Sequence, residues 1–379
     1  MTPVRLVYLL MLIPFTGMLA ARVAIPLYAL ELGASAFEVG VIAAMYQVFG
    51  LLLAYAVGVV QDRYGTRAMF SCGALAGGAG MLLPYFFPGM TALYAASALL
   101  GLWSVIQVVP VQSMMGVLSP PHRVARDLSR LNVFGWLTAV AGPLVAGAGI
   151  DVLGHGRVFL ALLPFTLATL GLLALWGGLL PRGQRSAGAG ISLREALFDP
   201  ALRPMFVLGV LAQFAIDLFY FFLPLFGHAR GLPASVIGAV MAACAAGSIP
   251  AALALPRLAA RAGGMRLLGA SFALSALAYL LLPVFESAAL LGAVAVLYGL
   301  GVGCAQTLVS LLMFRHTPKE RMGAIMGTRM MLNNLVRVIG PAAFGGLVGA
   351  LGLASGPLAA ACVLGCASWT VLRRRREPG

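Results

Sequence analysis

Four charged side chains lie inside long apolar segments of this chain: Arg22, Asp217, Arg329 and Arg337. Charged groups are disfavoured in a hydrocarbon environment, so those that occur there usually mark functional sites. An aspartic acid in such a place can take up and release a proton. An arginine stays charged when buried and can bind a carboxylate or phosphate group. These residue types therefore favour proton transfer and anion binding.

Arg22 and Asp217 are expected to form an ion pair. An internal repeat relates the two halves of the chain by 198 residues, and it places Asp217 at the level of Leu19. Leu19 and Arg22 are three residues apart, which is about 4.5 Å along a helix. We expect the pair to form an outer gate that protonation of Asp217 releases, with a static pair as the alternative. As the acid that lies well within a span, Asp217 is also the leading candidate for proton coupling.

A polar stripe runs along the eleventh apolar segment, because Arg329, Asn333 and Arg337 recur at intervals of four residues. Arg329 lies near the cytoplasmic end of this segment, where it could serve Asp62. Arg337 has no acidic residue close to it in sequence, and we expect its planar guanidinium to bind an anionic substrate group. The alternative is that Arg337 bonds to backbone carbonyls freed at Pro341.

Further polar and aromatic residues share helical faces and are candidate substrate contacts. They are Trp103 and Gln107 on one segment, Gln213 and Tyr220 on the segment of Asp217, and Tyr298 and Gln306 on a third. Together with Arg22, Asn333 and Arg337 they predict an amphipathic cavity with a few polar anchors. Packing is the alternative for each of them taken alone.

The elements that would position these residues are long apolar helices. Of the 379 residues, 61% are hydrophobic and 9% are charged, against about 25% charged in soluble domains. Stretches of about 20 apolar residues, the length that crosses a bilayer, recur along the chain. In lipid they must be helical, because every backbone polar group needs an internal partner. The predicted spans are 5–29, 36–60, 68–87, 90–117, 127–150, 157–180, 203–227, 233–256, 266–284, 287–314, 323–350 and 354–372.

The formal charge of +14 indicates orientation in a membrane and no nucleic-acid partner. Twenty basic residues fall at segment ends and loops on the side of the N-terminus, and two, Arg157 and Arg230, fall on the other side. Basic loops stay in the cytoplasm. We therefore expect a multi-pass protein of the bacterial inner membrane with both termini in the cytoplasm. The first apolar run is too long for the core of a signal peptide and matches a later segment, so it counts as a span.

The repeat also predicts the domain organisation. Pro26-Leu27 recurs as Pro224-Leu225, Gly40 recurs as Gly238, and Gly142-Pro143 recurs as Gly340-Pro341. All these matches have the same offset of 198 residues, without a gap. The longest polar break lies between the two copies. We expect a six-helix bundle over 1–180, a cytoplasmic linker over 181–202, and a second six-helix bundle with a basic cytoplasmic tail over 203–379.

One loop carries a more specific pattern. Gly58-Val-Val-Gln-Asp62-Arg63-Tyr-Gly65-Thr-Arg67 resembles the cytoplasmic loop signature of the major facilitator superfamily, G-x-x-x-D-R-x-G-x-R. The resemblance covers essentially the whole chain and implies an all-α integral membrane fold of twelve helices in two pseudo-symmetric six-helix bundles. It also makes Asp62, Arg63, Gly65 and Arg67 a conformational latch, with Asp62 facing the positive end of the eleventh helix and Arg329 as a partner. The alternative is that Asp62 is only a topology charge.

A second pattern bears on the branch of that superfamily. The run from Gly142 to Gly147 resembles the end of a signature typical of drug:proton antiporters, although its upstream glycines are missing. The arginine that the family usually has in the fourth span is absent, and Gln107 and Gln112 are the polar residues there. The drug:proton antiporter-like branch is therefore the nearest pattern, with simple helix packing as the alternative.

The sequence lacks the residue patterns of a phosphate-binding loop and of a metal site. Lys319, the one lysine, does not stand in a phosphate-binding loop. The four histidines lie at loops or helix ends without metal-ligand spacing, and the five cysteines behave as small apolar residues. We predict no enzyme activity, no metal and no cofactor. We also predict a monomer whose partners are lipid, protons and a small-molecule substrate.

The leading hypothesis is a secondary transporter that works by alternating access and exports an amphipathic, anionic or zwitterionic compound with proton coupling. The excess of arginine over aspartate inside the spans favours such a substrate over a cationic drug. One alternative is proton-coupled symport of an organic anion into the cell. A second alternative is a transporter-like sensor that moves no solute.

Overall fold

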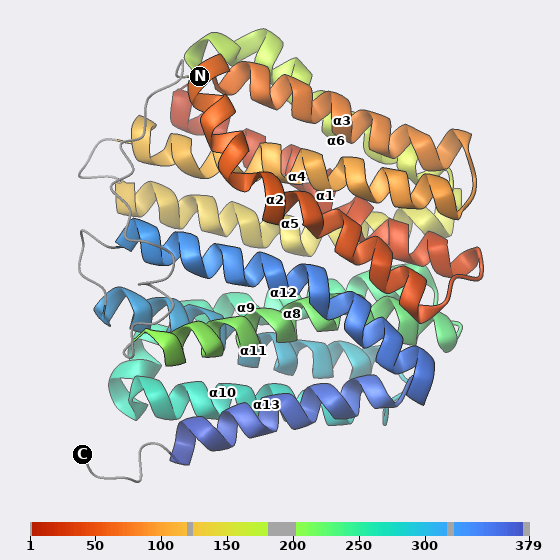
Figure 1. Cartoon of the computed structure of the whole chain (residues 1–379). Coiled ribbons are helices and arrows are strands. Elements are labelled where there is room, and N and C mark those ends of the chain that lie inside the picture. Colours follow the sequence, from red (N-terminus) through yellow and green to blue (C-terminus); the bar gives the residue numbers. More distant parts are fainter. Residues whose placement is uncertain (1, 120–123, 181–201, 317–321, 374–379) are drawn as a thin grey trace. The chain divides into compact units, whose positions relative to one another are not determined.

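The computed structural model describes residues 2–119, 124–180, 202–316 and 322–373. Within these ranges the chain is built of α-helices joined by short turns, and it contains no strand there. Twelve of the described helices are long and apolar enough to cross a membrane. The predicted all-α membrane fold with twelve spans is therefore confirmed, and Figure 1 follows the chain through these helices.

Six spanning helices precede residue 181. They are α1 (Pro3–Glu31), α2 (Ala36–Tyr64), α3 (Thr66–Phe86), α4 (Met90–Leu118), α5 (Val124–Leu153) and α6 (Val158–Trp176). The sixth ends earlier than the predicted span 157–180 and is followed by a 3₁₀ turn, η1 (Gly177–Leu179). Two consecutive glycines, Gly177 and Gly178, account for this early end because glycine disfavours the α-helix.

Six further spanning helices follow residue 201. They are α8 (Arg203–Ala229), α9 (Ala234–Ala262), α10 (Gly264–Leu281), α11 (Ala288–His316), α12 (Met322–Leu351) and α13 (Ser355–Arg373). The predicted linker over 181–202 lies outside the described residues, apart from Leu202. The division into two bundles at that linker therefore stays a prediction.

Two glycine turns place the same backbone geometry in both copies of the repeat. Gly65 precedes α3 with φ 83°, and Gly263 precedes α10 with φ 78°. These angles lie in the left-handed region, which glycine enters readily because it has no Cβ. α2 and α9 continue to these turns and are therefore longer than the predicted spans, which end at 60 and 256.

The repeat also recurs in close helix packing. Gly101 of α4 lies against the carbonyl of Tyr46 in α2, and Gly299 of α11 lies against the carbonyl of Cys244 in α9. A Cβ at either glycine would overlap the neighbouring backbone. Small residues at such crossings let transmembrane helices approach closely. The same contact is thus made twice, 198 residues apart.

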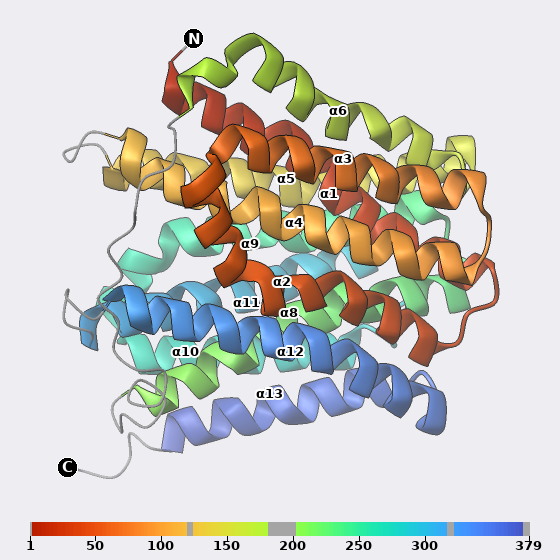
Figure 2. The same ribbon diagram turned by 45° about the horizontal axis from the view of Figure 1, so that its top comes forward.

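The chain separates into two compact units. The first unit contains α1 to α6, η1 and Pro224–Ala242, and the second contains α8 up to Leu223 and the chain from Ala243 onward. In the first unit α1 packs against α4, α5 and α6, and α3 packs against α4 and α6, as Figure 2 shows for α3 and α4. In the second unit α10 packs against α11 and α13, which lie beside it in Figure 1.

Candidate functional site

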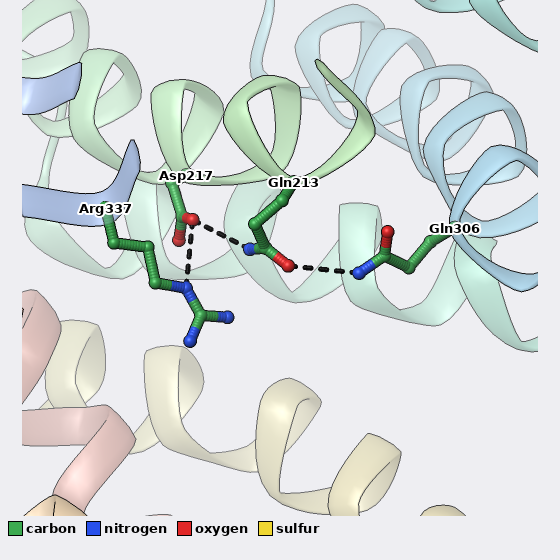
Figure 3. A network of polar contacts seen from close by, with 4 residues as sticks. All are labelled: Gln213, Asp217, Gln306 and Arg337. Carbon is green, nitrogen blue, oxygen red and sulfur yellow. Dashed lines mark hydrogen bonds and ion pairs between the residues drawn. The ribbon is translucent and has the colours of Figure 1, made fainter. Parts of the chain in front are cut away.

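Asp217 lies in α8, which has the largest buried share of the described spans, 67%. A charged group in such a helix needs partners inside the protein. The Asp217 side chain is 5% exposed, and its Oδ2 accepts hydrogen bonds from Gln213 Nε2 at 2.7 Å and from Arg337 Nε at 3.1 Å. Gln213 reaches Asp217 because residues four apart share a helical face, whereas Arg337 comes from α12 (Figure 3).

The ion pair with Asp217 gives Arg337 a partner that the sequence does not predict, while binding of a solute anion by Arg337 stays a prediction. The sequence leaves Arg337 without an acidic neighbour and so available to a bound anion, but the structure gives it a carboxylate 120 residues away. Sequence indicates how high a residue lies along its helix and does not indicate which helices are neighbours, which is why this partner was not found. The expected pair between Asp217 and Arg22 stays a prediction.

A chain of side-chain amides continues from Asp217 to α11. Gln306 Nε2 donates to Gln213 Oε1 at 3.0 Å, and Gln213 in turn donates to Asp217 (Figure 3). Gln306 Oε1 is buried and has no hydrogen-bond partner within the described chain. The charge on Asp217 is therefore linked through two neutral amides to an acceptor that is still unused.

Arg329 lies two helical turns before Arg337 on the same stripe of α12. Its Nη1 donates to Ser310 Oγ of α11 at 2.7 Å, and Ser310 donates to the carbonyl of Gln306 at 2.8 Å. Gly209 of α8 faces the Arg329 guanidinium and leaves room for it. Arg329 Nε is buried without a partner among the described residues, so burial of this guanidinium is only partly compensated.

These contacts form one polar ladder in the second unit. Arg329 contacts Ser310, and Arg337 contacts Asp217. Asn333 lies between these two arginines on α12, one helical turn from each. The Gln306–Gln213 hydrogen bond joins α11 to α8. Asn333 Oδ1 is a further buried acceptor without a partner in the described chain. The polar ladder thus combines one ion pair with two acceptors and one donor that have no partner among the described residues, and these can bind water or polar groups of a solute.

Two tyrosines predicted to contact a substrate, Tyr298 of α11 and Tyr220 of α8, differ in burial. Tyr298 is 1% exposed, donates to the carbonyl of Ala215 at 2.5 Å and stacks on Phe219 with ring centroids 4.6 Å apart. Tyr279 donates to the same carbonyl at 3.3 Å. Tyr220 is half-buried and meets Phe219 edge to face. Packing therefore accounts for the contacts of Tyr298, and its role as a substrate contact stays a prediction.

In the first unit two predicted contacts serve the scaffold. Trp103 is fully buried, and its ring fills the space left by Gly73 and Gly77 of α3. Gln107 is also fully buried, and its Nε2 donates to the carbonyl of Leu10 in α1 at 3.0 Å. Both side chains join α4 to its neighbours. Their role as substrate contacts stays a prediction.

Arg22 is half-buried in α1. Its guanidinium carbon lies 5.8 Å from the centroid of the Tyr46 ring in α2. A cation over an aromatic face is stabilised by the ring's negative potential. This contact joins the two helices of the first unit at the level where the sequence places a gate.

Only some side chains of the predicted cytoplasmic latch lie within the described part of the structure. The side chain of Asp62 lies outside the described part of the structure. Arg63 is exposed with its guanidinium 5.4 Å from the Tyr64 ring centroid, and Gly65 makes the turn described above. Arg67 lies against Gly177, where an added Cβ would come within 3.0 Å of the Arg67 Nε. The turn and the two arginines are therefore placed, while the latch itself stays a prediction.

The described residues hold no cluster of histidine, cysteine and acidic side chains suited to a metal ion.

The chemistry open to the polar ladder is an exchange of binding partners at Asp217 and Arg337. A proton bound to Asp217 would remove the attraction between its carboxylate and the Arg337 guanidinium. Ser310 and Gly209 belong to the site but were missed from sequence. The available signal was Ser310, four residues after Gln306 on the same face of α11.

Comparison with known proteins supports a transporter. The sequence matches the Major Facilitator Superfamily profile over residues 7–341. It is 24% identical over 151 residues to an uncharacterized MFS-type transporter of Methanocaldococcus jannaschii, and the match spans 39% of this chain and 39% of that relative.

Solved structures with the same fold cover nearly the whole chain. A POT family transporter in complex with 5-aminolevulinic acid has a TM-score of 0.79 at 14% identity, over 98% of this chain and 95% of that chain. The nucleoside transporter NupG has a TM-score of 0.74 at 14% identity over 100% of both chains. A bacterial homologue of the iron transporter ferroportin, in an inward-facing state, has a TM-score of 0.74 at 15% identity over 97% and 98%. At these identities the likeness concerns the fold alone.

Proposed function

The chain belongs to the major facilitator superfamily and is a multi-pass membrane transporter of a small molecule, and we propose that it exports a zwitterionic organic solute in exchange for protons. The proposed mechanism is alternating access. The proposed setting is a bacterial inner membrane with both termini in the cytoplasm, which the distribution of basic residues supports.

The observation that carries the proposal is the buried pair of Asp217 and Arg337. Asp217 can bind a proton, whereas an arginine keeps its charge when buried. When Asp217 is protonated, the guanidinium of Arg337 loses its carboxylate partner and becomes available to another anion. One protonation event at a 5% exposed carboxyl group therefore changes what the neighbouring cation can bind.

A zwitterionic solute can replace both members of the pair at once. Its carboxylate would bind Arg337 and its amine would bind Asp217, so both buried charges would stay compensated. The amine and the proton then compete for the same carboxylate, and binding of one expels the other. Competition of this kind couples the two binding equilibria and is the thermodynamic basis of exchange.

A specific observation favours symport of an organic anion as the second candidate. Arg337 contacts Asp217 through Nε, while its two terminal nitrogens point away from the carboxylate (Figure 3). The Arg337 side chain is 32% exposed. An anion without an amine would bind these nitrogens best when Asp217 is protonated. Proton and anion would then bind together, as symport requires.

Two parts of the proposal rest on sequence patterns. The drug:proton antiporter-like branch is supported by Gly142-Pro143; in the structure Gly142 packs closely on Leu19 of α1, which helix packing explains equally well. The cytoplasmic latch is supported by Asp62 within its loop signature. Neither part is needed for the proton chemistry at Asp217.

The sign of the pH effect on solute binding tests the proposal. The purified protein is screened by thermal shift against carboxylates, amino acids, organic phosphates and organic cations, and the affinity of the best ligand is then measured from acid to alkaline pH. Exchange predicts a zwitterion whose affinity rises with pH, and symport predicts an anion whose affinity rises as the pH falls. Preferential binding of organic cations that lack an acidic group would contradict both candidates.

A further inference from the structure

Two helices begin at matching places in the repeat but have different caps. α2 begins after Ser35, whose N–H and hydroxyl both donate to Glu38 Oε2 at 2.8 Å, while the Glu38 N–H donates to Ser35 Oγ at 3.3 Å. This reciprocal pair is a capping box. In the second copy Pro233 and Val236 stand in these two positions. Neither side chain can accept a hydrogen bond, so α9 lacks a capping box of its own.

Asp151, near the end of α5, supplies the missing cap. The N–H of Ala234 donates to Asp151 Oδ1 and the N–H of Ser235 donates to Asp151 Oδ2, each at 3.0 Å. The first N–H groups of a helix have no acceptor within that helix, and a negative charge beside them also complements the positive end of the helix dipole. Asp151 therefore does for another helix what Glu38 does for its own. We call this contact the Asp151 cap.

The backbone around the Asp151 cap is packed to bring the two helices together. Pro143, Gly147 and Asp151 are spaced four residues apart and so share one face of α5. Gly147 lies against the carbonyl of Ala234, and Gly238 lies against the carbonyl of Pro143. A Cβ at either glycine would overlap the opposite backbone. The contact therefore extends over about two turns and depends on close approach of α5 and α9.

We propose that Asp151 is a positioning residue of the transport cycle, which holds the start of α9 against α5 in one conformation and releases it in the other. The inference rests on the alternating-access function proposed above. α9 begins in the first unit and enters the second at Ala243, so a contact at its start can bias the movement of the whole helix.

The conformation that the Asp151 cap favours follows from the helix that supplies the capping side chain. When α5 and α9 separate, the N–H groups of Ala234 and Ser235 lose their acceptor, whereas α2 keeps Glu38 in every conformation. Loss of a helix cap destabilises the helix start. The Asp151 cap therefore favours the conformation in which α5 and α9 touch, and neutralising Asp151 weakens that preference.

Distance measurements between two spin labels can test the proposal. One label is placed at Val152 of α5, which is 81% exposed, and the other at exposed Ala239 of α9, after the five native cysteines are replaced. The distance distribution is recorded by pulsed electron paramagnetic resonance in lipid nanodiscs. We expect Asp151→Asn to raise the ratio of separated to touching molecules about two- to fivefold, the lower end of what a lost helix cap gives, because Asp151 is exposed.

Two further variants control for a purely local effect. Glu38→Gln weakens a cap within α2 and is expected to leave the distance distribution unchanged. The pair Pro233→Ser with Val236→Glu gives α9 its own capping box, and in this background Asp151→Asn is expected to change the ratio by less than about twofold.

Three results would overturn the proposal. They are an unchanged distribution in Asp151→Asn, including one accompanied by lower thermal stability, an equal shift in Glu38→Gln, and a full shift by Asp151→Asn in the background with the new capping box. The measurement requires neither substrate nor a proton gradient. Failure of proton coupling at Asp217 would therefore leave its outcome unaffected.

Discussion

The helix pair α1–α4 of the first unit and the pair α8–α11 of the second correspond through the repeat but hold their helices together differently. In the first pair, the Gln107 amide donates to a backbone carbonyl, that of Leu10. In the second, Gln306 donates to Gln213, which donates to Asp217. A backbone acceptor cannot change its charge, whereas a carboxylate can. The second pair therefore has a means of responding to protons that this contact in the first pair lacks.

The scaffold contacts do not differ in this way. Gly101 and Gly299 make the same close approach to a neighbouring helix, and Gly65 and Gly263 make the same turn. The repeat thus preserves backbone geometry in both copies, and the residues that depart from the repeat carry the chemistry. The following changes test this division, beginning with the largest expected effect.

Replacing Arg337 should have the largest effect. In Arg337→Ala the buried Asp217 carboxylate loses its cationic partner, and we expect a loss of about 3 kcal/mol in stability at neutral pH, the lower end of the range for breaking a buried pair, because Arg337 is 32% exposed. Thermal unfolding measures this loss, and substrate affinity should fall further in Arg337→Ala than in Arg337→Lys. The double variant Asp217→Asn with Arg337→Ala should recover most of the stability. Equal stability of the single and double variants would contradict the pairing.

Alanine at the two close-packed glycines should have equal effects in both copies. Gly101→Ala and Gly299→Ala each force a Cβ against a neighbouring backbone, and overpacking of this kind costs about 1–3 kcal/mol. Gly171→Ala is the control, because no atom lies within 4 Å of its added Cβ. Thermal unfolding in detergent provides the comparison. A large effect at one of the two glycines alone would show that the scaffold is not shared.

Leucine at the two glutamines should separate the scaffold from the proton chemistry. Gln107→Leu removes one hydrogen bond, whereas Gln213→Leu removes two, the one donated to Asp217 and the one accepted from Gln306. Each bond is worth about 1 kcal/mol, so thermal stability at neutral pH should fall about twice as far in Gln213→Leu. Gln213→Leu should also shift the pH dependence of solute binding, because Asp217 loses a donor that favours its charged form. Gln107→Leu should leave that dependence unchanged. Identical pH profiles in the two variants would remove Gln213 from the coupling site.

The smallest effect is expected at His155, in the loop between α5 and α6. Its ring stacks on Tyr28 with centroids 6.1 Å apart. Burial lowers the pKa of His155, and the charge of His228 lowers it too, while Glu31 and Asp151 oppose the shift.

The sign of the pH effect follows from this lowered pKa. As the pH falls below about 6.5, the unfolded histidine takes up a proton before the folded one does, so stability declines towards acid. His155→Phe keeps an aromatic ring beside Tyr28 and should make the stability less sensitive to pH between neutral and mildly acid conditions. An unchanged slope of stability against pH would show that His155 does not titrate in this environment.

Much of the fold and part of the site could be predicted from sequence. Apolar length predicted the spans, because each helix must satisfy its own backbone in lipid, and helix ends differed where glycine sets them, as at Gly65 and Gly177. Asp217 and Arg337 were predicted as functional residues because charge is disfavoured within a span. Their contact was not predicted, because the identity of neighbouring helices depends on tertiary packing.

Aromatic and capping residues were harder to interpret. Trp103 and Tyr298 share helical faces with polar residues, and the same spacing suits a cavity wall and a buried contact equally well. From sequence alone Asp151 had no assigned role. Its role as a cap has a sequence signal only in the repeat, where Pro233 replaces the capping serine of α2.

The central claim is that Asp217 couples protons to solute movement, and simultaneous measurement of proton and solute fluxes tests it most directly. Wild-type protein and Asp217→Asn are reconstituted in liposomes with an imposed pH gradient, with the best ligand from the binding screen as the solute. We predict that the wild type accumulates solute against its gradient while protons move. Asp217→Asn should equilibrate the solute without accumulation and without proton flux. Accumulation by Asp217→Asn at the wild-type level, with the same pH dependence, would contradict the account.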